Sequence, residues 1–282
     1  MAFACIFIIT LLVFHEWLVT LFVQSFDHDT NDYIPLVPLV SAFFFYIDRK
    51  RIFADTKYSV VPGVGAIGVG VGVYVLAMNR GESLGQNNLL SAVAFSAVII
   101  WIGGFMGCYG VRAANRALFP LLFLLFVVPI PSLIMGKVVA VLQESSAEAA
   151  AKMFGLVGVP VLREGFVFHL TGMSIEVAEQ CSGIHSALAL FITSIVAGKL
   201  FLKPGWRRIA LGIVVFPIAV TKNGLRIVTL TLLGNYVDAR ILSSALHRQG
   251  GIPFFVLAVT VLLLVLWLLR WSERFQRGLR PA

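Results

Sequence analysis

The sequence predicts an all-α integral membrane protein with about eight transmembrane helices, and two observations lead to this fold class. The first is composition: the 282-residue chain is 59% hydrophobic and only 13% charged, whereas soluble domains are roughly 45–50% apolar and about 25% charged. The second is that the apolar residues gather in long runs separated by short polar segments, as in helices that cross a bilayer. We therefore expect a single polytopic membrane domain over residues 1–282.

The apolar runs place the expected spans at about 3–24, 34–47, 60–78, 89–108, 117–140, 184–201, 209–233 and 252–271. The first run has no basic residue ahead of it and no small-residue cleavage site, so we expect it to stay as a span. His15 and Glu16 lie in its middle, where ionisable groups are costly. They indicate either a polar pair that faces the bundle or a functional site.

Glycine and proline give three of these spans a special character. The run 60–78 contains alternating glycines, which let helices approach closely, and it lacks the lysine and the strand–helix context of a phosphate loop. Two prolines stand near the start of 34–47, where a helix tolerates them. Pro129 and Pro131 interrupt the run 117–140 and must break its helical hydrogen bonds.

The longest non-spanning segment covers about 141–183. Residues 145–155 predict a short amphipathic helix on the membrane surface, with Ser146 as a candidate N-cap. Glycines between β-branched and aromatic residues follow, and they indicate short strands or a hairpin. We expect both elements on the outer face.

Basic residues set the expected orientation of the chain. Four regions fall on the inner face if the N-terminus is inside: 48–57, 112–116, 199–208 and the tail from 270. They hold most of the 22 Lys and Arg residues, whereas most of the 14 acidic residues fall outside. The positive-inside rule therefore predicts cytoplasmic N- and C-termini. Because the basic residues are dispersed between apolar runs, the net charge of +8 is a topology signal, and no nucleic acid is expected as a partner.

Three residues suited to catalysis are expected on the outer side of the membrane in this orientation. Cys181 precedes the sixth span, Arg226 lies in the seventh, and His247 precedes the eighth. At about 1.5 Å per residue, Arg226 lies roughly 25 Å from the inner end of its helix, across a hydrocarbon core of about 30 Å. The sequence therefore predicts one polar site at the outer rim. Cys5 and Cys108 lie in or beside apolar runs and are expected to be small buried hydrophobes.

A thiol, a guanidinium and an imidazole are suited to acyl transfer. The thiolate is the reactive form of Cys181, and a helix N-terminus or a nearby cation favours it. His247 can accept the thiol proton and return it to a leaving amine. Arg226 stays protonated, so its expected work is to hold a carbonyl or carboxylate, or to stabilise an oxyanion.

Six neighbours are expected to support this site or bind the substrate, and Ser182 and Gly183, which directly follow the nucleophile, are two of them. His185 is a rival base, because it follows Cys181 by four residues and a helix would place both on one face. Glu179 can orient a histidine or bind a basic group of the substrate. Lys222 is a lipid-headgroup or substrate contact, or a lysine of the cavity, and Asn223 is a neutral hydrogen-bond partner.

Taken together, these residues resemble the exosortase/archaeosortase family of membrane-embedded cysteine transpeptidases. The resemblance covers most of the chain from about residue 27. It rests on Cys181-Ser182-Gly183-Ile184, on Asn223-Gly224-Leu225-Arg226-Ile227, on His247 with Gly251 four residues later, and on the proline-rich stretch 119–131.

The resemblance implies a multi-pass enzyme of the plasma (inner) membrane whose active site faces the periplasmic or extracellular side. Its partners would be membrane proteins with a C-terminal sorting signal, which combines a short motif such as PEP, a hydrophobic helix and a basic tail. Cleavage would leave a thioester on Cys181, with Arg226 and His247 in the other two catalytic positions. A lipid or glycan acceptor would then take the acyl group, and neither a cofactor nor a metal is expected.

Other functions stay open on the residues alone. A cysteine protease (a thiol hydrolase) would pass the same thioester to water. A multi-span transporter would suit the broken fifth span and the intramembrane Lys222 and Arg226, although no paired broken segments occur in two halves. A purely structural assembly protein is the third alternative. Replacing Cys181 with serine separates the transporter and the assembly protein, which should mostly keep their function, from a thiol enzyme, which should lose it.

Overall fold

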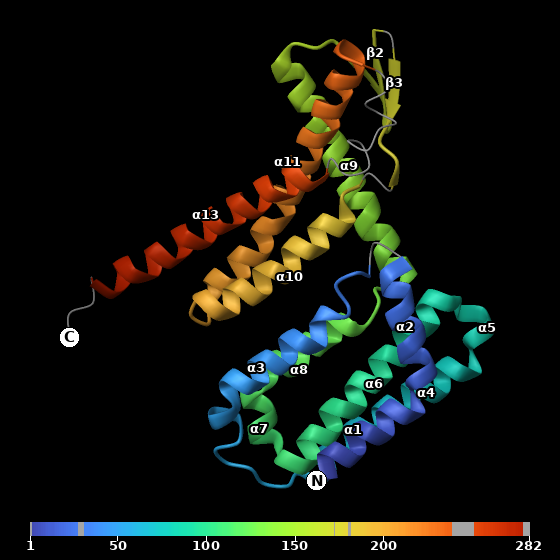
Figure 1. The fold of residues 1–282 in the computed structure, drawn as a ribbon, viewed down its shortest axis with the longest axis vertical. Coiled ribbons are helices and arrows are strands. Elements are labelled where there is room, and N and C mark those ends of the chain that lie inside the picture. The colour runs from blue at the N-terminus through green and yellow to red at the C-terminus, as the bar shows by residue number, and fades with distance from the viewer. Residues whose placement is uncertain (1, 28–30, 172, 180–181, 239–250, 279–282) are drawn as a thin grey trace. The chain divides into compact units, whose positions relative to one another are not determined.

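The computed structural model describes residues 2–27, 31–171, 173–179, 182–238 and 251–278 (Figure 1). The chain divides into two compact units, residues 1–135 and 136–282, which are described one at a time. The single membrane domain stays a prediction.

The first unit is helical throughout its described residues. Its elements are α1 (Ala2–Val13), α2 (His15–Asp27), α3 (Leu36–Ile52), α4 (Val60–Asn79), α5 (Gly81–Leu84), α6 (Gln86–Tyr109), α7 (Val111–Arg116), α8 (Leu118–Phe123) and the 3-10 helix η1 (Leu124–Val127). Helix α6 is the centre of this unit, because 61% of an apolar 18-residue stretch of α6 is buried inside the protein, against 17% for such a stretch of α4.

Two of the five glycines of α4, Gly63 and Gly70, bring it into close contact with α6. A Cβ atom on Gly63 would lie 2.5 Å from the Cα of Gly107, and a Cβ on Gly103 would lie 2.8 Å from the backbone nitrogen of Ile67. No side chain fits at either position. At the other three glycines of α4 an added Cβ would meet no atom within 4 Å, so the predicted close contact is confirmed for part of the pattern.

The first expected span is bent. Helices α1 and α2 meet at the buried Phe14, where the chain bends by 71°. His15 Nδ1 lies 3.1 Å from the carbonyl oxygen of Leu12, and both His15 and Glu16 are exposed. The expectation that this pair faces the bundle is wrong, because the bend turns Phe14 inward and leaves the next two side chains outside.

The second unit combines long helices with a small sheet. Its elements are α9 (Ser132–Val157, which begins at the end of the first unit), β1 (Leu162–Glu164), β2 (Val167–Leu170), β3 (Met173–Glu176), α10 (Ile184–Phe201), α11 (Trp206–Tyr236) and α13 (Gly251–Gly278). The strands form an antiparallel sheet in the order β1-β2-β3, and Phe168 pairs with both Arg163 and Ile175. The predicted hairpin is confirmed and gains a third strand.

The expected short helix at 145–155 is instead the second half of α9. Helix α9 runs without interruption for 26 residues, and Ser146 is buried inside it rather than at its start. The residues before Ser146 are ordinary helix formers, so nothing stops the helix there. The sheet packs on this half of α9, where Phe168 meets Phe154 with ring centroids 5.6 Å apart. Figure 1 shows β2 and β3 in yellow near the orange end of α11.

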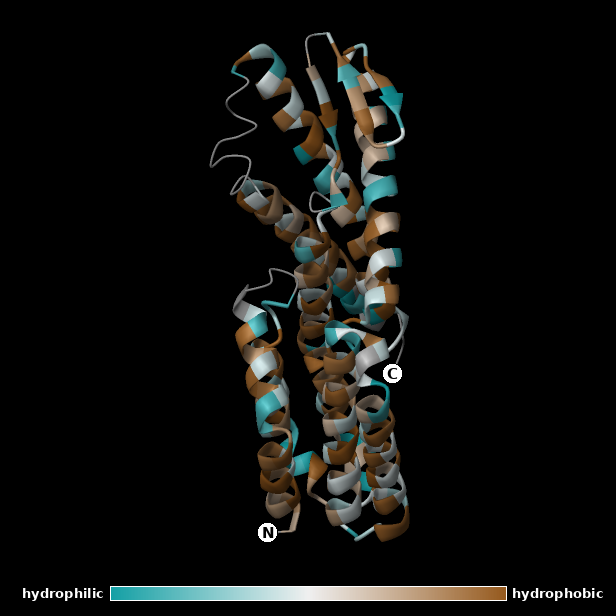
Figure 2. Ribbon diagram, turned by 90° about the vertical axis from the view of Figure 1, so that its right-hand side faces the viewer, coloured by the Kyte–Doolittle hydropathy of each residue, from teal (hydrophilic) through white to brown (hydrophobic). Residues whose placement is uncertain are grey.

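The integral membrane fold is confirmed. Helices α4, α6, α10, α11 and α13 are each long and apolar enough to cross a membrane, and two bent pairs raise the number among the described residues to seven. Hydrophobic residues dominate along these helices (Figure 2). The remaining expected span is the 17-residue α3. Eight spans and cytoplasmic termini therefore stay predictions.

The predicted break at Pro129 and Pro131 is present between η1 and α9. The expected burial of the two remaining cysteines is wrong: Cys5 is exposed on α1 and Cys108 is half-buried. Both lie in runs that are apolar around the whole helix, so the sequence does not show which face is covered.

Candidate functional site

Contacts at the ends of α10, α11 and α13 show how far along this bundle of three helices Arg226 lies. The Lys203 N–H donates to Glu273 Oε1 at 3.1 Å, and Arg207 donates to Ser272 Oγ at 3.3 Å. The far part of α13 therefore lies at the turn between α10 and α11. From this turn, roughly 20 residues lead back along α10 to its start, and a similar number lead back along α13 to its start and forward along α11 to Arg226. Each path is about 30 Å long. The two helix starts and Arg226 therefore lie at about the same position along the bundle.

The three helices pack together along this length. Their shared core consists of Leu190, Leu202, Leu211, Val215, Ala258, Leu262 and Leu266. Because the side chains of all three helices interlock, the common level of the two helix starts and Arg226 is a property of the packed unit.

The structure describes one of the three predicted catalytic residues. Arg226 is half-buried in α11. Cys181 and His247 lie outside the described residues. In the sequence Cys181 stands three positions before α10, and His247 stands four positions before α13. The structure therefore brings together the two helix starts that adjoin these residues, and Arg226 with them.

Gly183 forms the turn that leads into α10. Its φ of +77° lies in the left-handed region, which favours glycine. A Cβ atom at this position would lie 3.0 Å from Cγ and Oδ1 of Asn223. The preceding Ser182 is 2% exposed, and its N–H donates to the carbonyl oxygen of Glu179 at 3.0 Å. Backbone conformation and close packing against α11 therefore both require glycine here.

The helical argument for His185 is wrong. Helix α10 begins at Ile184, and Gly183 is left-handed, so no continuous helix joins Cys181 to His185. The half-buried His185 sits in the first turn of α10. A spacing of four residues places side chains on one face only within an unbroken helix.

The supporting residues predicted from the sequence fall into two groups. Asn223 is 1% exposed and Lys222 is 5% exposed, and both face the first turn of α10. Lys222 donates a hydrogen bond to Ser186 Oγ, and Ser186 in turn donates to the carbonyl oxygen of Gly183 at 2.9 Å. Glu179 is exposed. A buried Lys222 does not suit a lipid-headgroup contact.

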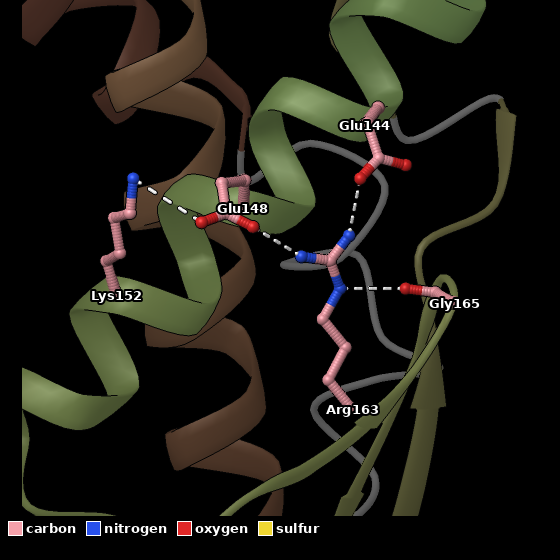
Figure 3. Close-up of polar contacts among 5 residues, drawn as sticks. All are labelled: Glu144, Glu148, Lys152, Arg163 and Gly165. Carbon is pink, nitrogen blue, oxygen red and sulfur yellow. Dashed lines mark hydrogen bonds and ion pairs between the residues drawn. The ribbon is translucent and has the colours of Figure 1, made fainter.

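Two residues that sequence reasoning missed anchor the segment before the site. Arg163 on β1 donates to Glu144 Oε1 and to Glu148 Oε2 on α9, both at 2.8 Å, and to the carbonyl oxygen of Gly165 (Figure 3). The spacing of Glu144 and Glu148 on one helix face is visible in the sequence, but their partner on a strand is not. The charged cluster ties the sheet to α9.

The buried Gln143 is the second missed residue. Its Nε2 donates to the carbonyl oxygen of Val177 at 2.7 Å, directly after β3. Helix α9 also meets α11 closely, since a Cβ on Gly224 would lie 3.0 Å from the Cβ of Ala149. Helix α9, the sheet and α11 thus form one support from which the chain enters the Glu179–Gly183 segment.

The fold, and the polar residues where the first turn of α10 meets α11, define a multi-span membrane protein with a polar site. The family model of transmembrane exosortases matches residues 3–273, which is nearly the whole chain. The chain belongs to the transmembrane exosortase family, and the resemblance drawn from its motifs is confirmed. Membership supports a membrane-embedded sorting transpeptidase that acts on membrane-associated substrates. No curated protein and no solved structure matches the chain.

Proposed function

We propose that this protein cleaves a C-terminal sorting signal on the outer face of the plasma membrane through a thioester on Cys181, and passes the acyl group to an acceptor. The observation that carries the proposal is the common level of three features: Arg226, the start of α10 and the start of α13. The nucleophile and the base stand directly before those two helices in the sequence. Family membership supplies the class of reaction.

The first half-reaction forms the thioester. The thiolate of Cys181 attacks the carbonyl carbon of the scissile peptide bond, and the negative charge moves onto the carbonyl oxygen. Arg226 stabilises this oxyanion, and a single donor of that kind contributes about 2.7–4 kcal/mol. The carbon–nitrogen bond then breaks, and the imidazolium of His247 gives its proton to the departing amine.

The second half-reaction transfers the acyl group. A hydroxyl or amine of the acceptor attacks the thioester and gives its proton to His247, and the thiolate of Cys181 leaves. A lipid or glycan acceptor completes a transpeptidation, whereas water completes a hydrolysis. The chemistry at the three residues is the same in both cases.

His247 is the preferred base of this proposal. The half-buried His185 lies in the first turn of α10, and the unbroken helix that would have linked it to Cys181 is missing. Glu179, Ser182 and Gly183 shape the entry to α10 around the nucleophile. The orientation, with eight spans and both termini inside, rests on the distribution of basic residues.

Mass spectrometry of a co-expressed membrane protein that carries a C-terminal motif, helix and basic tail tests the proposal. The wild type should yield a shortened C-terminus, and the mass added to it distinguishes a lipid, a glycan or water. Cys181→Ala should leave the substrate at full length, while Cys108→Ala should process it normally. Full processing by Cys181→Ala would refute the thioester mechanism.

A further inference from the structure

Lys222 is a buried cation that the proposed mechanism does not use. It is 5% exposed within α11, and the ion pairs of the described residues include no carboxylate partner for it. A buried ammonium is costly unless its N–H donors find acceptors. Its placement therefore calls for a reason beyond solubility or topology.

The contacts of Lys222 lead to the turn before α10. Its ammonium donates to Ser186 Oγ, and Ser186 donates to the carbonyl oxygen of Gly183 at 2.9 Å. The Ser186 hydroxyl thus links Lys222 on α11 to the backbone of Gly183. Without Lys222, the serine would keep its bond to the carbonyl but lose the anchor on the neighbouring helix.

Asn223 holds the same turn from the adjacent position. The Asn223 side chain is 1% exposed, and its Cγ and Oδ1 atoms lie 3.0 Å from the position that a Cβ of Gly183 would take. Two consecutive residues of α11 therefore fix one turn, Asn223 by packing and Lys222 by hydrogen bonding. The turn is defined by its partner helix as well as by its own backbone.

This turn is next to the nucleophile in the chain. Only Ser182 stands between Gly183 and Cys181 in the sequence, and a peptide chain spans at most about 7 Å over two residues. A shift of the turn by about 1 Å displaces the backbone that leads to the nucleophile, and misplacements of about that size strongly reduce the rate of an enzyme.

We propose that Lys222 is a positioning residue for the nucleophile: through Ser186 it holds the first turn of α10 and thereby the segment that carries Cys181. The role rests on the proposed function, because it assumes that Cys181 is the nucleophile. Lys222 touches neither substrate nor acceptor in this role. Its loss should therefore change the rate of the chemical step and leave substrate binding as it was.

The test uses the full chain with Cys5→Ala and Cys108→Ala, so that Cys181 is the single thiol, purified in lipid nanodiscs. Two quantities are measured: kcat and KM for processing of the tailed substrate, and the rate of Cys181 alkylation by iodoacetamide. Because a hydrogen bond to a charged group is lost, Lys222→Met should lower kcat by about ten- to a hundredfold. KM should stay within about twofold of the parent value, and the alkylation rate should change by a similar factor as kcat.

Three matched variants separate positioning from a general loss of structure. Ser186→Ala removes the linking hydroxyl but keeps the cation, and should lower kcat in the same direction. Ser186→Thr keeps the hydroxyl and should restore kcat. Lys137→Met removes an exposed lysine of the same unit and should change nothing.

Each result decides a separate point. Unchanged kcat and alkylation in Lys222→Met would overturn the positioning role, and so would a rise in KM at constant kcat, which would indicate a substrate contact. If Lys222→Met does not fold, equal activities of Ser186→Ala and Ser186→Thr would overturn it. Processing that survives Cys181→Ala would instead remove the proposed function, and the alkylation rates would still report whether Lys222 holds the turn.

Discussion

Replacing Gly183 with alanine tests the turn that leads into α10. A residue with a side chain pays roughly 1–2 kcal/mol in the left-handed region, and the φ of Gly183 is +77°. The new Cβ would also lie 3.0 Å from Asn223, which must move by a few tenths of an ångström. Because Asn223 is 1% exposed, overpacking adds about 1–3 kcal/mol. We expect a total cost of about 2–5 kcal/mol, placed two residues from the nucleophile.

A second glycine provides the matched control. Gly165 also has a positive φ, +61°, but a Cβ there meets no atom within 4 Å. Gly165→Ala should therefore show the backbone strain alone, with nearly normal processing of the tailed substrate. The assays are thermal unfolding in nanodiscs and the initial rate of tail removal.

Combining Gly183→Ala with Asn223→Ala isolates the steric part. The two substitutions should couple favourably in a double-mutant cycle, because the smaller residue 223 makes room for the new Cβ. Equal unfolding temperatures and equal rates for Gly183→Ala and Gly165→Ala would refute the reasoning, since they would mean that α11 does not press on this turn.

Three further outcomes are expected. Arg226→Ala and His247→Ala should each abolish tail removal while the protein still inserts into the membrane, and an intact tail with normal protein levels on a gel would establish this. Gln143→Leu should destabilise the protein by about 1–3 kcal/mol, because the carbonyl of the buried Val177 loses its donor, as thermal unfolding would show. The Arg112 side chain donates to Asp55 at 3.0 Å and holds the pKa of that carboxyl below its usual value. The pair should therefore stabilise the protein above the unfolded-state pKa of about 3.9 and lose this effect as the pH falls through the lower folded-state pKa, so that wild type and Asp55→Asn differ at neutral pH and converge in acid.

Hydropathy predicted the helices well because the signal is carried by whole runs of residues. Six of the eight expected spans each coincide with one helix and the other two with bent pairs of helices, and two of the five glycines of α4 meet α6. The bend at Phe14 was not predictable, since no proline or glycine marks it. The continuity of α9 past Ser146 was missed because a capping residue is a local preference, and packing on the sheet and α11 overrides it.

The sequence offers candidates for the reactive groups, whose acyl-transfer role stays a prediction, but it does not show what supports them. Cysteine, arginine and histidine in this order led to that prediction without any knowledge of the fold. The links from Lys222 to Ser186 and from Gln143 to Val177 depend on how one element is placed against another. These contacts depend on how the helices and the sheet of the whole unit pack together, and no local sequence pattern indicates them.

The bond between Lys203 and Glu273 has a consequence for the order of biogenesis. The acid near the end of α13 is 8% exposed and joins the turn that precedes α11. A ribosome delivers that turn about seventy residues before its partner, so a half-made chain contains the turn between α10 and α11 without the acid that binds it. The packing of these two helices against α13 is therefore completed only after the last helix has been made.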